Sequence, residues 1–379
     1  MKNGGIEITA EQVAQGITYQ ALKDKEGNPF VVAVYNLAPS LFPEKYRDLA
    51  GPLPLLIAEK GEKGWGWERA HLQDMAALHN MYVSTDGTYF TPAMEKIARE
   101  EFSAYVTELD LTWNKIEPEK GKLDQRRISH VRQLMREGKF IIANNLVSWG
   151  DYPDWLKTLS PEEKEQALKD HIELVMRAFP EIKVWVIVNE FHDLKYHPDI
   201  LQQEIGDYRV LAFQTARKVR PDAILLLGDN QNELKGSINH QRNIEFLAQG
   251  FADGIAVHLH QEGDDLPTQS QLAEGFRDFT SKGYRLYITE HDINLRNVSI
   301  SNRLIIQAYG FYIAVKAAID SSAESYGVWG IQDNQSWLEN PNLRSSLGNR
   351  YSPNADPLLF DDNFFPKLSY YAVMAAFLR

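Results

Sequence analysis

The sequence contains no cysteine, and this absence excludes several kinds of site. Disulfide bonds, thiolate metal centres and a cysteine nucleophile all need a thiol, so none is available to this chain of 379 residues. Basic residues are also outnumbered, because Lys and Arg total 40 against 52 for Asp and Glu, which gives a net charge of −12. This surplus of negative charge disfavours nucleic acids and anionic membranes as partners and favours solubility.

Long apolar runs, tethers and repeats are missing as well. No apolar stretch reaches the ~18 residues that a membrane-spanning helix needs. The opening residues, MKNGGIEITAEQ, do not form a signal peptide, so we expect a mature extracellular chain and leave a cytoplasmic location open. No Gly/Ser-rich or Pro-rich tether, internal repeat or low-complexity segment divides the chain, and we expect a monomer.

Eight short apolar runs alternate with helical patterns from residue 81 onward. Such runs are typical of parallel strands that are covered on both faces. Between them, SPEE at 160–163 predicts a capped helix start, and an amphipathic pattern runs from Asp124 to Gly138. The alternation predicts an α/β fold, a (β/α)8 TIM barrel. The runs are MYVST (81–85), AYVTEL (104–109), FIIANNL (140–146), VWVIVNE (184–190), AILLLGD (223–229), GIAVHLH (254–260), LYITE (286–290) and YGVWGI (326–331).

Residues 1–80 do not follow this alternation. The stretch GITYQALKDKEGNPFVVAVYNL predicts a hairpin around EGNP, and WERAHLQDMAALHN predicts a helix that leads into the first barrel strand. We therefore expect an N-terminal extension, 1–80, packed on a catalytic barrel, 81–379. We expect the aromatic residues of GWGWER (64–69) to attach the extension to the barrel, in preference to binding sugar. The extension could also cover one end of a substrate cleft.

Polar residues at the ends of the predicted strands are the candidates for chemistry, because the active sites of such barrels lie at the carboxyl ends of the strands. Glu190 and Glu290 each follow an apolar run, so two carboxylates from different strands can face one another. Glycoside hydrolysis uses such a pair, one as acid and one as nucleophile or base. The candidates are Glu108, Asn144, Asn189, Glu190, Asp229, His258, His260, Glu290, Asp292 and Asp333.

Seven stretches from residue 107 onward together resemble glycoside hydrolase family 10, the family of the endo-β-1,4-xylanases. The similarity spans 81–379, and this order of motifs is specific although each motif alone is weak. The stretches are TELDLTWNKIEPEKG (107–121), VWVIVNE (184–190), IGDYRVLAFQTARKVRPDA (205–223), GIAVHLH (254–260), ITEHDI (288–293), GVWGIQDNQSWL (327–338) and PLLFDDNFFPKLSYYAV (357–373).

The resemblance implies a retaining β-glycoside hydrolase that cleaves xylan or xylo-oligosaccharides by double displacement. It makes Glu190 the acid/base and Glu290 the nucleophile, and we expect repulsion between them to raise the pKa of Glu190. His260 and Asp292 match a network that supports the nucleophile. Asn189 is expected to bind the sugar 2-hydroxyl. The residues expected to bind substrate are Glu108, Asn144, Asn189, His258, His260, Trp329 and Trp337.

The substrate-holding positions depart from the family pattern, which makes the chain a divergent member. Leu109 and Thr112 stand where the family has Asn and Lys, and a glutamine of the sixth strand becomes His258. Loss of groups that bind hydroxyls changes specificity strongly. Another β-linked polysaccharide or oligosaccharide therefore stays open as the substrate.

Three other interpretations remain beside hydrolysis of xylan. A non-hydrolytic carbohydrate-binding barrel would not need both Glu190 and Glu290, and a transglycosylase would use the same covalent intermediate. His258 and His260, with nearby carboxylates, also resemble ligands for zinc or manganese. A cation beside Glu290 would quench its nucleophilicity, so we expect neither a metal nor a cofactor.

Overall fold

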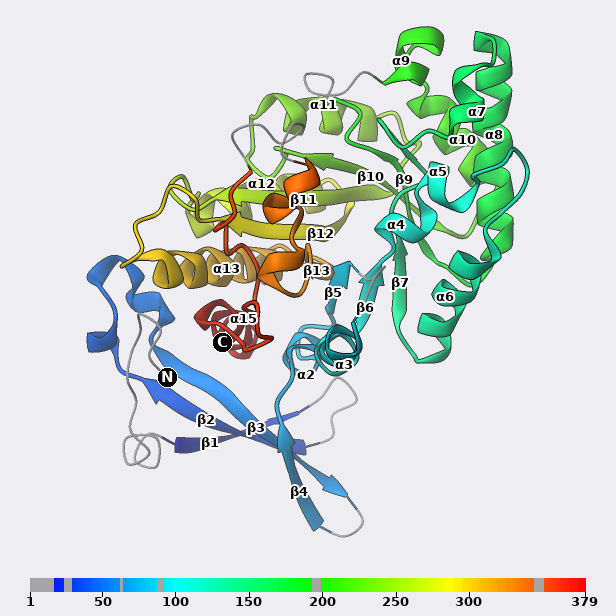
Figure 1. Ribbon diagram of the computed structural model, residues 1–379. Coiled ribbons are helices and arrows are strands. Elements are labelled where there is room, and N and C mark those ends of the chain that lie inside the picture. The colour runs from blue at the N-terminus through cyan, green and yellow to red at the C-terminus, as the bar shows by residue number, and fades with distance from the viewer. Residues whose placement is uncertain (1–16, 24–28, 62–63, 87–90, 193–198, 344–350) are drawn as a thin grey trace.

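The computed structural model describes residues 17–23, 29–61, 64–86, 91–192, 199–343 and 351–379, with the side chains of 59–61, 64–67, 108 and 343 excepted (Figure 1). Its centre is a closed ring of parallel strands, in which β10 pairs with β9 as well as with β11, and β13 pairs with β5. The predicted (β/α)8 barrel is therefore confirmed. The ring runs through β5 (Tyr82–Asp86), β6 (Ala104–Val106), β7 (Phe140–Ala143), β9 (Val184–Asn189), β10 (Ile224–Asn230), β11 (Gly254–Glu262), β12 (Arg285–Asn294) and β13 (Ser325–Val328).

Helices surround this ring and cover the outer face of the strands (Figure 1). None of the described helices combines the length and apolar character that crossing a bilayer requires. The longer helices are α3 (Pro92–Glu101), α6 (Gln125–Arg136), α8 (Pro161–Ala178), α10 (Arg209–Val219), α11 (Ile238–Leu247), α12 (Gln269–Thr280), α13 (Arg303–Asp320) and α15 (Leu368–Leu378). Shorter elements are α2 (Leu72–Ala77), α4 (Glu108–Leu111), α5 (Trp113–Ile116), α7 (Asp154–Lys157), α9 (Ile200–Ile205) and the two-residue strand β8 (Val147–Ser148).

Local sequence explains where the predicted helices begin and end. Ser160 caps α8 by accepting a hydrogen bond from the Glu163 amide, and the Glu163 side chain accepts one from the Ser160 amide. Asp124 accepts from the Arg126 amide at the start of α6. After α6 the chain reverses at Gly138, whose φ of 82° is one that glycine adopts without strain. Both helix predictions are confirmed.

Several predicted boundaries were wrong. Strands β7 and β13 end at Ala143 and Val328, before their predicted ends, and β12 continues to Asn294. Two further differences have a clear cause. The apolar run AYVTEL suggested a strand to residue 109, but β6 ends at Val106 and α4 begins at Glu108. The predicted helix 67–80 is shorter, because α2 covers only Leu72–Ala77 and Trp67–Arg69 belong to strand β4. In both cases, tertiary pairing decided a boundary that local apolar patterning left open.

The N-terminal extension forms its own antiparallel sheet in the order β1-β2-β3-β4. The predicted hairpin is confirmed by the pairing of β1 with β2, although most of its EGNP turn lies outside the described residues. The sheet consists of β1 (Ile17–Lys23), β2 (Pro29–Leu37), β3 (Gly51–Gly61) and β4 (Gly64–Arg69). The 3-10 turns η1 (Pro39–Leu41) and η2 (Glu44–Leu49) connect β2 to β3.

The extension packs against helices α13 and α15 (Figure 1). Strand β3 packs on α15, and Tyr46 of η2 meets Tyr309 of α13 edge to face with ring centroids 5.2 Å apart. The guanidinium of Arg379 donates to the carbonyls of Asp48, at 2.8 Å, and Pro52, at 3.2 Å. The side chains of Trp65 and Trp67, which suggested attachment to the barrel, lie outside the described part of the chain.

Candidate active site

The pairing of neighbouring strands gathers the predicted site residues at the carboxyl end of the barrel. Asn189 lies opposite Gly228 in the β9–β10 pair, and Asn230 lies opposite His258 in the β10–β11 pair. The β11–β12 register shifts by one residue after Val257, so His258 faces Glu290 instead of Thr289, and His260 faces Asp292. Residues two apart on a strand share a face, and both His258 and His260 therefore reach the same side as Glu290 and Asp292.

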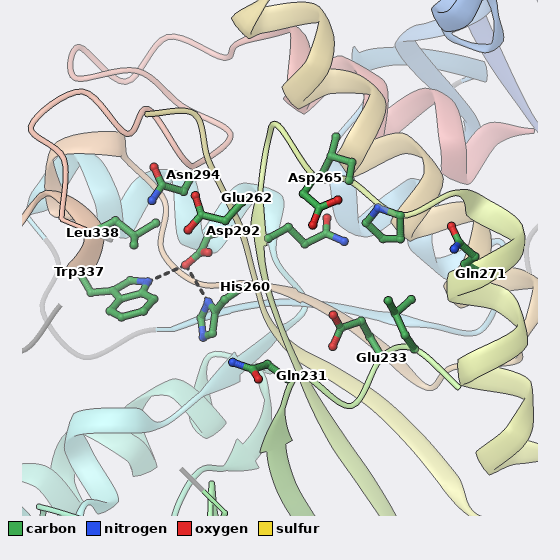
Figure 2. Close-up of a pocket in the computed structure, with 14 residues that line it drawn as sticks. Gln231, Glu233, His260, Glu262, Asp265, Gln271, Asp292, Asn294, Trp337 and Leu338 are labelled. Atoms are coloured by element: carbon green, nitrogen blue, oxygen red, sulfur yellow. Dashed lines mark hydrogen bonds and ion pairs between the residues drawn. The ribbon is translucent and has the colours of Figure 1, made fainter. Parts of the chain in front are cut away.

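Glu290 is buried, and its two carboxylate oxygens contact Asn144 and His260. The Asn144 amide donates to its Oε1 over 2.9 Å, and His260 Nε2 lies 3.2 Å from its Oε2. On the other side of the ring, His260 Nδ1 lies 2.9 Å from Asp292 Oδ2. Trp337 Nε1 donates to the same Asp292 oxygen over 2.6 Å (Figure 2). This chain of contacts from Trp337 through Asp292 and His260 fixes the orientation of the Glu290 carboxylate.

Glu190 stands just beyond the end of β9, and its backbone is strained. Its φ of 50° lies in the left-handed region, which non-glycine residues rarely adopt and which often marks functional positions. The Asn230 amide donates to Glu190 Oε1 over 3.1 Å, and His258 Nδ1 lies 3.0 Å from the same oxygen. The Glu190 carboxylate is therefore oriented by residues of the two following barrel strands.

A single imidazole, that of His258, links the two carboxylates. Its Nδ1 contacts Glu190, while its Nε2 lies 3.2 Å from Glu290 Oε1. Burial lowers the pKa of His258, but the charges of Glu290 and Glu190 outweigh burial and raise it above its ordinary value. The two glutamates thus favour the cation of His258.

This arrangement corrects the expectation that repulsion raises the pKa of Glu190. Burial does raise it, but the hydrogen bond from His258 and the positive charges of His258 and His260 dominate and lower the pKa of Glu190 below its ordinary range. The sequence indicated both carboxylates and His258, but it did not indicate that the imidazole of His258 lies between the two carboxylates. The proton shared by these two side chains is therefore held on His258 in preference to Glu190.

The other predicted substrate residues have different surroundings. Trp337 is partly exposed at the cavity, whereas Trp329 is only 8% exposed and packs on the apolar residues that fill the barrel. Asn189 is buried and its Oδ1 has no hydrogen-bond partner among the described residues. Glu108 begins α4, and its side chain lies outside the described part of the structure.

Sequence reasoning missed two polar residues of the site. Asn230, which holds Glu190, is the last residue of β10, and Asp86 is the last residue of β5. Burial, followed by repulsion from Glu290, raises the pKa of Asp86 to about 7. Both residues lie at strand ends, and this position was the signal that could have identified them. Asn230 was passed over because the neighbouring Asp229 was chosen as the strand-end candidate. Asp86 was passed over because the predicted first strand ended at residue 85.

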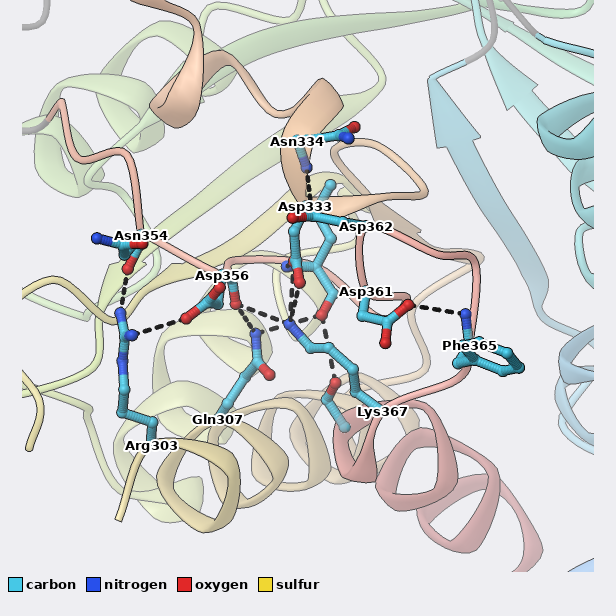
Figure 3. A network of polar contacts seen from close by, with 12 residues as sticks. Arg303, Gln307, Asp333, Asn334, Asn354, Asp356, Asp361, Asp362, Phe365 and Lys367 are labelled. Atoms are coloured by element: carbon cyan, nitrogen blue, oxygen red, sulfur yellow. Dashed lines mark hydrogen bonds and ion pairs between the residues drawn. The ribbon is translucent and has the colours of Figure 1, made fainter. Parts of the chain in front are cut away.

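Two predicted strand-end acids are not in this cluster. Asp229 accepts hydrogen bonds from the side-chain amide of Asn243 and from the backbone N–H of Asn230. Asp333 forms an ion pair with Lys367, whose ammonium lies 2.8 Å from its Oδ2, and it also accepts from the Leu358 amide (Figure 3). Asp333 thus ties the loop after β13 to the segment before α15.

Asp229 should make the stability of the protein depend on pH. Burial dominates its environment and raises its pKa to about 7, above the ~3.9 of an unfolded chain. A raised pKa stabilises the fold at acid pH, and that contribution is lost as pH rises through about 7. At pH ~8 we expect the free energy of unfolding of Asp229→Asn to exceed that of wild type by about 1–4 kcal/mol, so the variant unfolds at a higher denaturant concentration. At pH ~4 the two proteins should differ little.

The amide of Asn243 can turn so that its oxygen accepts from the new side chain, which keeps the local contact. Chemical denaturation of both proteins at the two pH values is the measurement. Parallel pH dependences for wild type and Asp229→Asn would show that Asp229 does not carry the effect.

Gly228 is required by the close approach of β9 to β10. A Cβ at this position would lie 2.4 Å from Asn189 Oδ1 and 2.7 Å from Val186 Cγ1. We expect Gly228→Ala to cost about 1–3 kcal/mol of stability, as overpacked cores do, and to lower kcat/KM by displacing Asn189. Thermal unfolding and steady-state kinetics check this, with Gly121→Ala as a comparison without a nearby contact but with a positive φ of 75°. Wild-type kinetics in Gly228→Ala would contradict the role of this spacing.

A cavity of about 460 Å³ opens beside the cluster of Glu190, His258, His260 and Glu290, at the ends of β10, β11 and β12 (Figure 2). Its lining includes His260 and Asp292, together with Gln231, Glu233 and Trp337. No lining residue comes from the described part of the extension, which contacts α13 and α15 instead. The described part of the extension therefore contributes no side chain to the lining of this cavity.

Known proteins share both the sequence pattern and the fold. The profile of glycosyl hydrolase family 10 matches residues 71–376. An endo-1,4-beta-xylanase B of Thermotoga neapolitana is 26% identical over 318 residues, which cover 80% of this chain and 89% of that protein. Xylanase 10B of Thermotoga petrophila RKU-1, solved in complex with xylobiose, is 25% identical with a TM-score of 0.71 over 82% of this chain and 98% of that chain.

One solved structure also extends over the N-terminal sheet. Xylanase10C of Cellvibrio japonicus, solved with xylopentaose, has a TM-score of 0.72 and covers 98% of this chain and 87% of that chain, at 17% identity. That identity supports the likeness of fold alone. The family profile, by contrast, spans most of the chain and includes both glutamates. The chain therefore belongs to glycosyl hydrolase family 10 and is a xylanase-like glycoside hydrolase.

Proposed function

We propose that this protein is a retaining β-glycosidase that hydrolyses xylan or xylo-oligosaccharides, with Glu290 as nucleophile and Glu190 as acid/base. The observation that carries the mechanism is the separation of the two carboxylates. One donor atom from each of Glu190, His258, His260 and Glu290 lies within 4.8 Å of the others, so carboxylate oxygens of the two glutamates are no farther apart than this. Retaining enzymes hold their carboxyl groups ~5–5.5 Å apart, whereas inverting enzymes leave ~6.5–9.5 Å for a water molecule.

In the first step, Glu290 attacks the anomeric carbon and the glycosidic oxygen leaves with a proton. Contacts from Asn144 and His260 orient the Glu290 oxygens for attack. The proton for the leaving group is held between Glu190 and His258, whose Oε1 and Nδ1 are 3.0 Å apart. The reactive form is the one in which this proton lies on Glu190.

In the second step, water attacks the glycosyl ester of Glu290 and loses its proton to Glu190. Formation of the ester removes the negative charge of Glu290, which was one of the charges favouring the His258 cation. Glu190 is ionised when it faces this water, because the first step consumed its proton. The same side chain thus serves as acid and then as base, as a double displacement requires.

Xylan is favoured as the substrate by the named relatives, which are xylanases, and by neighbours solved with xylobiose and xylopentaose. Within the described part of the chain, Oδ1 of Asn189 has no hydrogen-bond partner, and the hydroxyl of a sugar bound beside Glu190 would supply one. Trp337 offers an aromatic face at the cavity for stacking on a sugar ring. We also propose that residues 81–379 form the catalytic unit and that residues 1–80 are an extension which stabilises α13 and α15.

The test is release of reducing sugar from xylan, mixed-linkage β-glucan, arabinan and cellulose, with wild type beside Glu290→Ala. Release from xylan that disappears in the variant supports the proposal. Release from another polymer alone would keep the mechanism and assign the new specificity to the altered positions, such as Leu109, Thr112 and His258. Binding of xylo-oligosaccharides without any hydrolysis would favour a carbohydrate-binding barrel instead.

A further inference from the structure

The catalytic cluster contains more potential metal ligands than a retaining glycosidase needs. Glu190, His258, His260 and Glu290 each place one donor atom within 4.8 Å of the other three. Two carboxylates can perform a double displacement without any imidazole in contact with both. The presence of His258 between them therefore calls for an account of what else this cluster binds.

The separations of these donor atoms approach those of a metal site. Nε2 of His258 and Nε2 of His260 each lie 3.2 Å from an oxygen of Glu290. Two ligands of a tetrahedral zinc ion, with bonds of about 2.0–2.1 Å, are roughly 3.3 Å apart. The remaining donor atoms lie within 4.8 Å of one another, so they would have to move closer by at most about 1.5 Å to share one ion.

His258 Nε2 is already directed at this space. The residue is 1% exposed, and Nε2 makes no hydrogen bond among the described residues although Glu290 is close. Its other ring nitrogen, Nδ1, contacts Glu190. Its contact with Glu290 is thus an ion pair of 3.2 Å without hydrogen-bond geometry, and a cation placed between the two groups would be bound by both.

His260 has the arrangement that supports a metal-ligating histidine. Its Nδ1 contacts Asp292 Oδ2 at 2.9 Å, and that oxygen also accepts from Trp337. A carboxylate on the far nitrogen fixes the ring and increases the basicity of the nitrogen that meets the metal. The charges also match, because Glu190 and Glu290 together balance a divalent cation.

We propose that Glu190, His258, His260 and Glu290 form an inhibitory site for zinc or a similar borderline divalent cation. The bound ion occupies both catalytic carboxylates, so Glu290 cannot attack and Glu190 cannot exchange its proton. Inhibition is then competitive with a xylo-oligosaccharide. Mixed imidazole and carboxylate donors select zinc over magnesium or calcium, which prefer ligand sets of oxygen alone.

His258 is the residue that decides the affinity. Replacement by glutamine, His258→Gln, preserves a polar side chain at this position but removes the nitrogen ligand. We expect wild type to bind one zinc ion and to be inhibited by it, and His258→Gln to bind at least ~10-fold more weakly. Magnesium at the same concentration should leave wild type active.

The experiment combines calorimetric titration with zinc and inhibition kinetics, both at one fixed pH near neutrality. His130→Gln is the matched control, because it removes an imidazole that contacts a carboxylate, Asp110, at 2.7 Å outside this cluster. Circular dichroism and thermal unfolding show whether each variant folds. If His258→Gln does not fold, the same titration is made with Glu290→Ala, which lacks a different ligand of the site.

The inhibition readout rests on the proposed hydrolytic function, whereas the titration does not. Zinc binding that is lost in His258→Gln and kept in His130→Gln supports the site, even if no polysaccharide is cleaved. Failure of wild type to bind zinc, or equal binding by wild type and His258→Gln, would overturn it. Failure of hydrolysis in metal-free wild type would count against the proposed function alone.

Discussion

Glu290→Ala is expected to lose hydrolysis by roughly 10^4- to 10^6-fold, the scale found when a catalytic nucleophile is removed. Glu290 is 4% exposed and accepts contacts from Asn144 and His260, so its removal leaves no other carboxylate aimed from the same position. The shortened side chain also leaves space beside the anomeric carbon. Kinetics on an aryl β-xyloside and on xylan, compared with wild type, measure the loss.

Sodium azide should restore activity to Glu290→Ala. The small anion enters the vacated space and attacks from the face that the carboxylate used, so the product is the glycosyl azide of inverted, α configuration. Nuclear magnetic resonance of the product distinguishes the two anomers. Recovery without this α-azide, or no recovery with a folded variant, would reject Glu290 as the nucleophile.

Glu190→Ala is expected to separate substrates by their leaving groups. Removal of a general acid costs typically about 10²- to 10⁴-fold when the leaving group needs a proton. We expect that loss on xylo-oligosaccharides, whose leaving sugar hydroxyl is a weak acid. Aryl glycosides with acidic phenols need little protonation, so their first step should be almost unchanged. Their turnover would then be limited by the second step, which also uses Glu190.

The control for this prediction is Asn230→Ala. Asn230 holds Glu190 through one hydrogen bond of 3.1 Å but carries no transferable proton. It should lower activity on both substrate types by a smaller factor and should not separate them. The quantity to compare is kcat/KM, because it reports the first step alone. Equal losses of kcat/KM on natural and aryl substrates in Glu190→Ala would show that Glu190 is not the acid.

The sequence by itself determined the barrel and the two glutamates. Each barrel strand has a short, nearly continuous apolar run, because it is covered on both faces, and this pattern is visible in one dimension. Glu190 and Glu290 each come one residue after such a run, which predicted positions near the carboxyl ends of strands. Glu190 follows the end of β9, whereas Glu290 lies inside β12, which continues to Asn294. The caps of α6 and α8 were equally local, since Asp124 and Ser160 bond to amides only a few residues away.

Only the tertiary structure decided how the site is charged. The register shift between β11 and β12 sets His258 opposite Glu290, and strand pairing sets Asn230 beside His258. The resulting imidazole between the glutamates lowers the pKa of Glu190, where the sequence had suggested a raised value. A pKa depends on the distances between charges and on burial, and neither quantity exists until distant strands are paired.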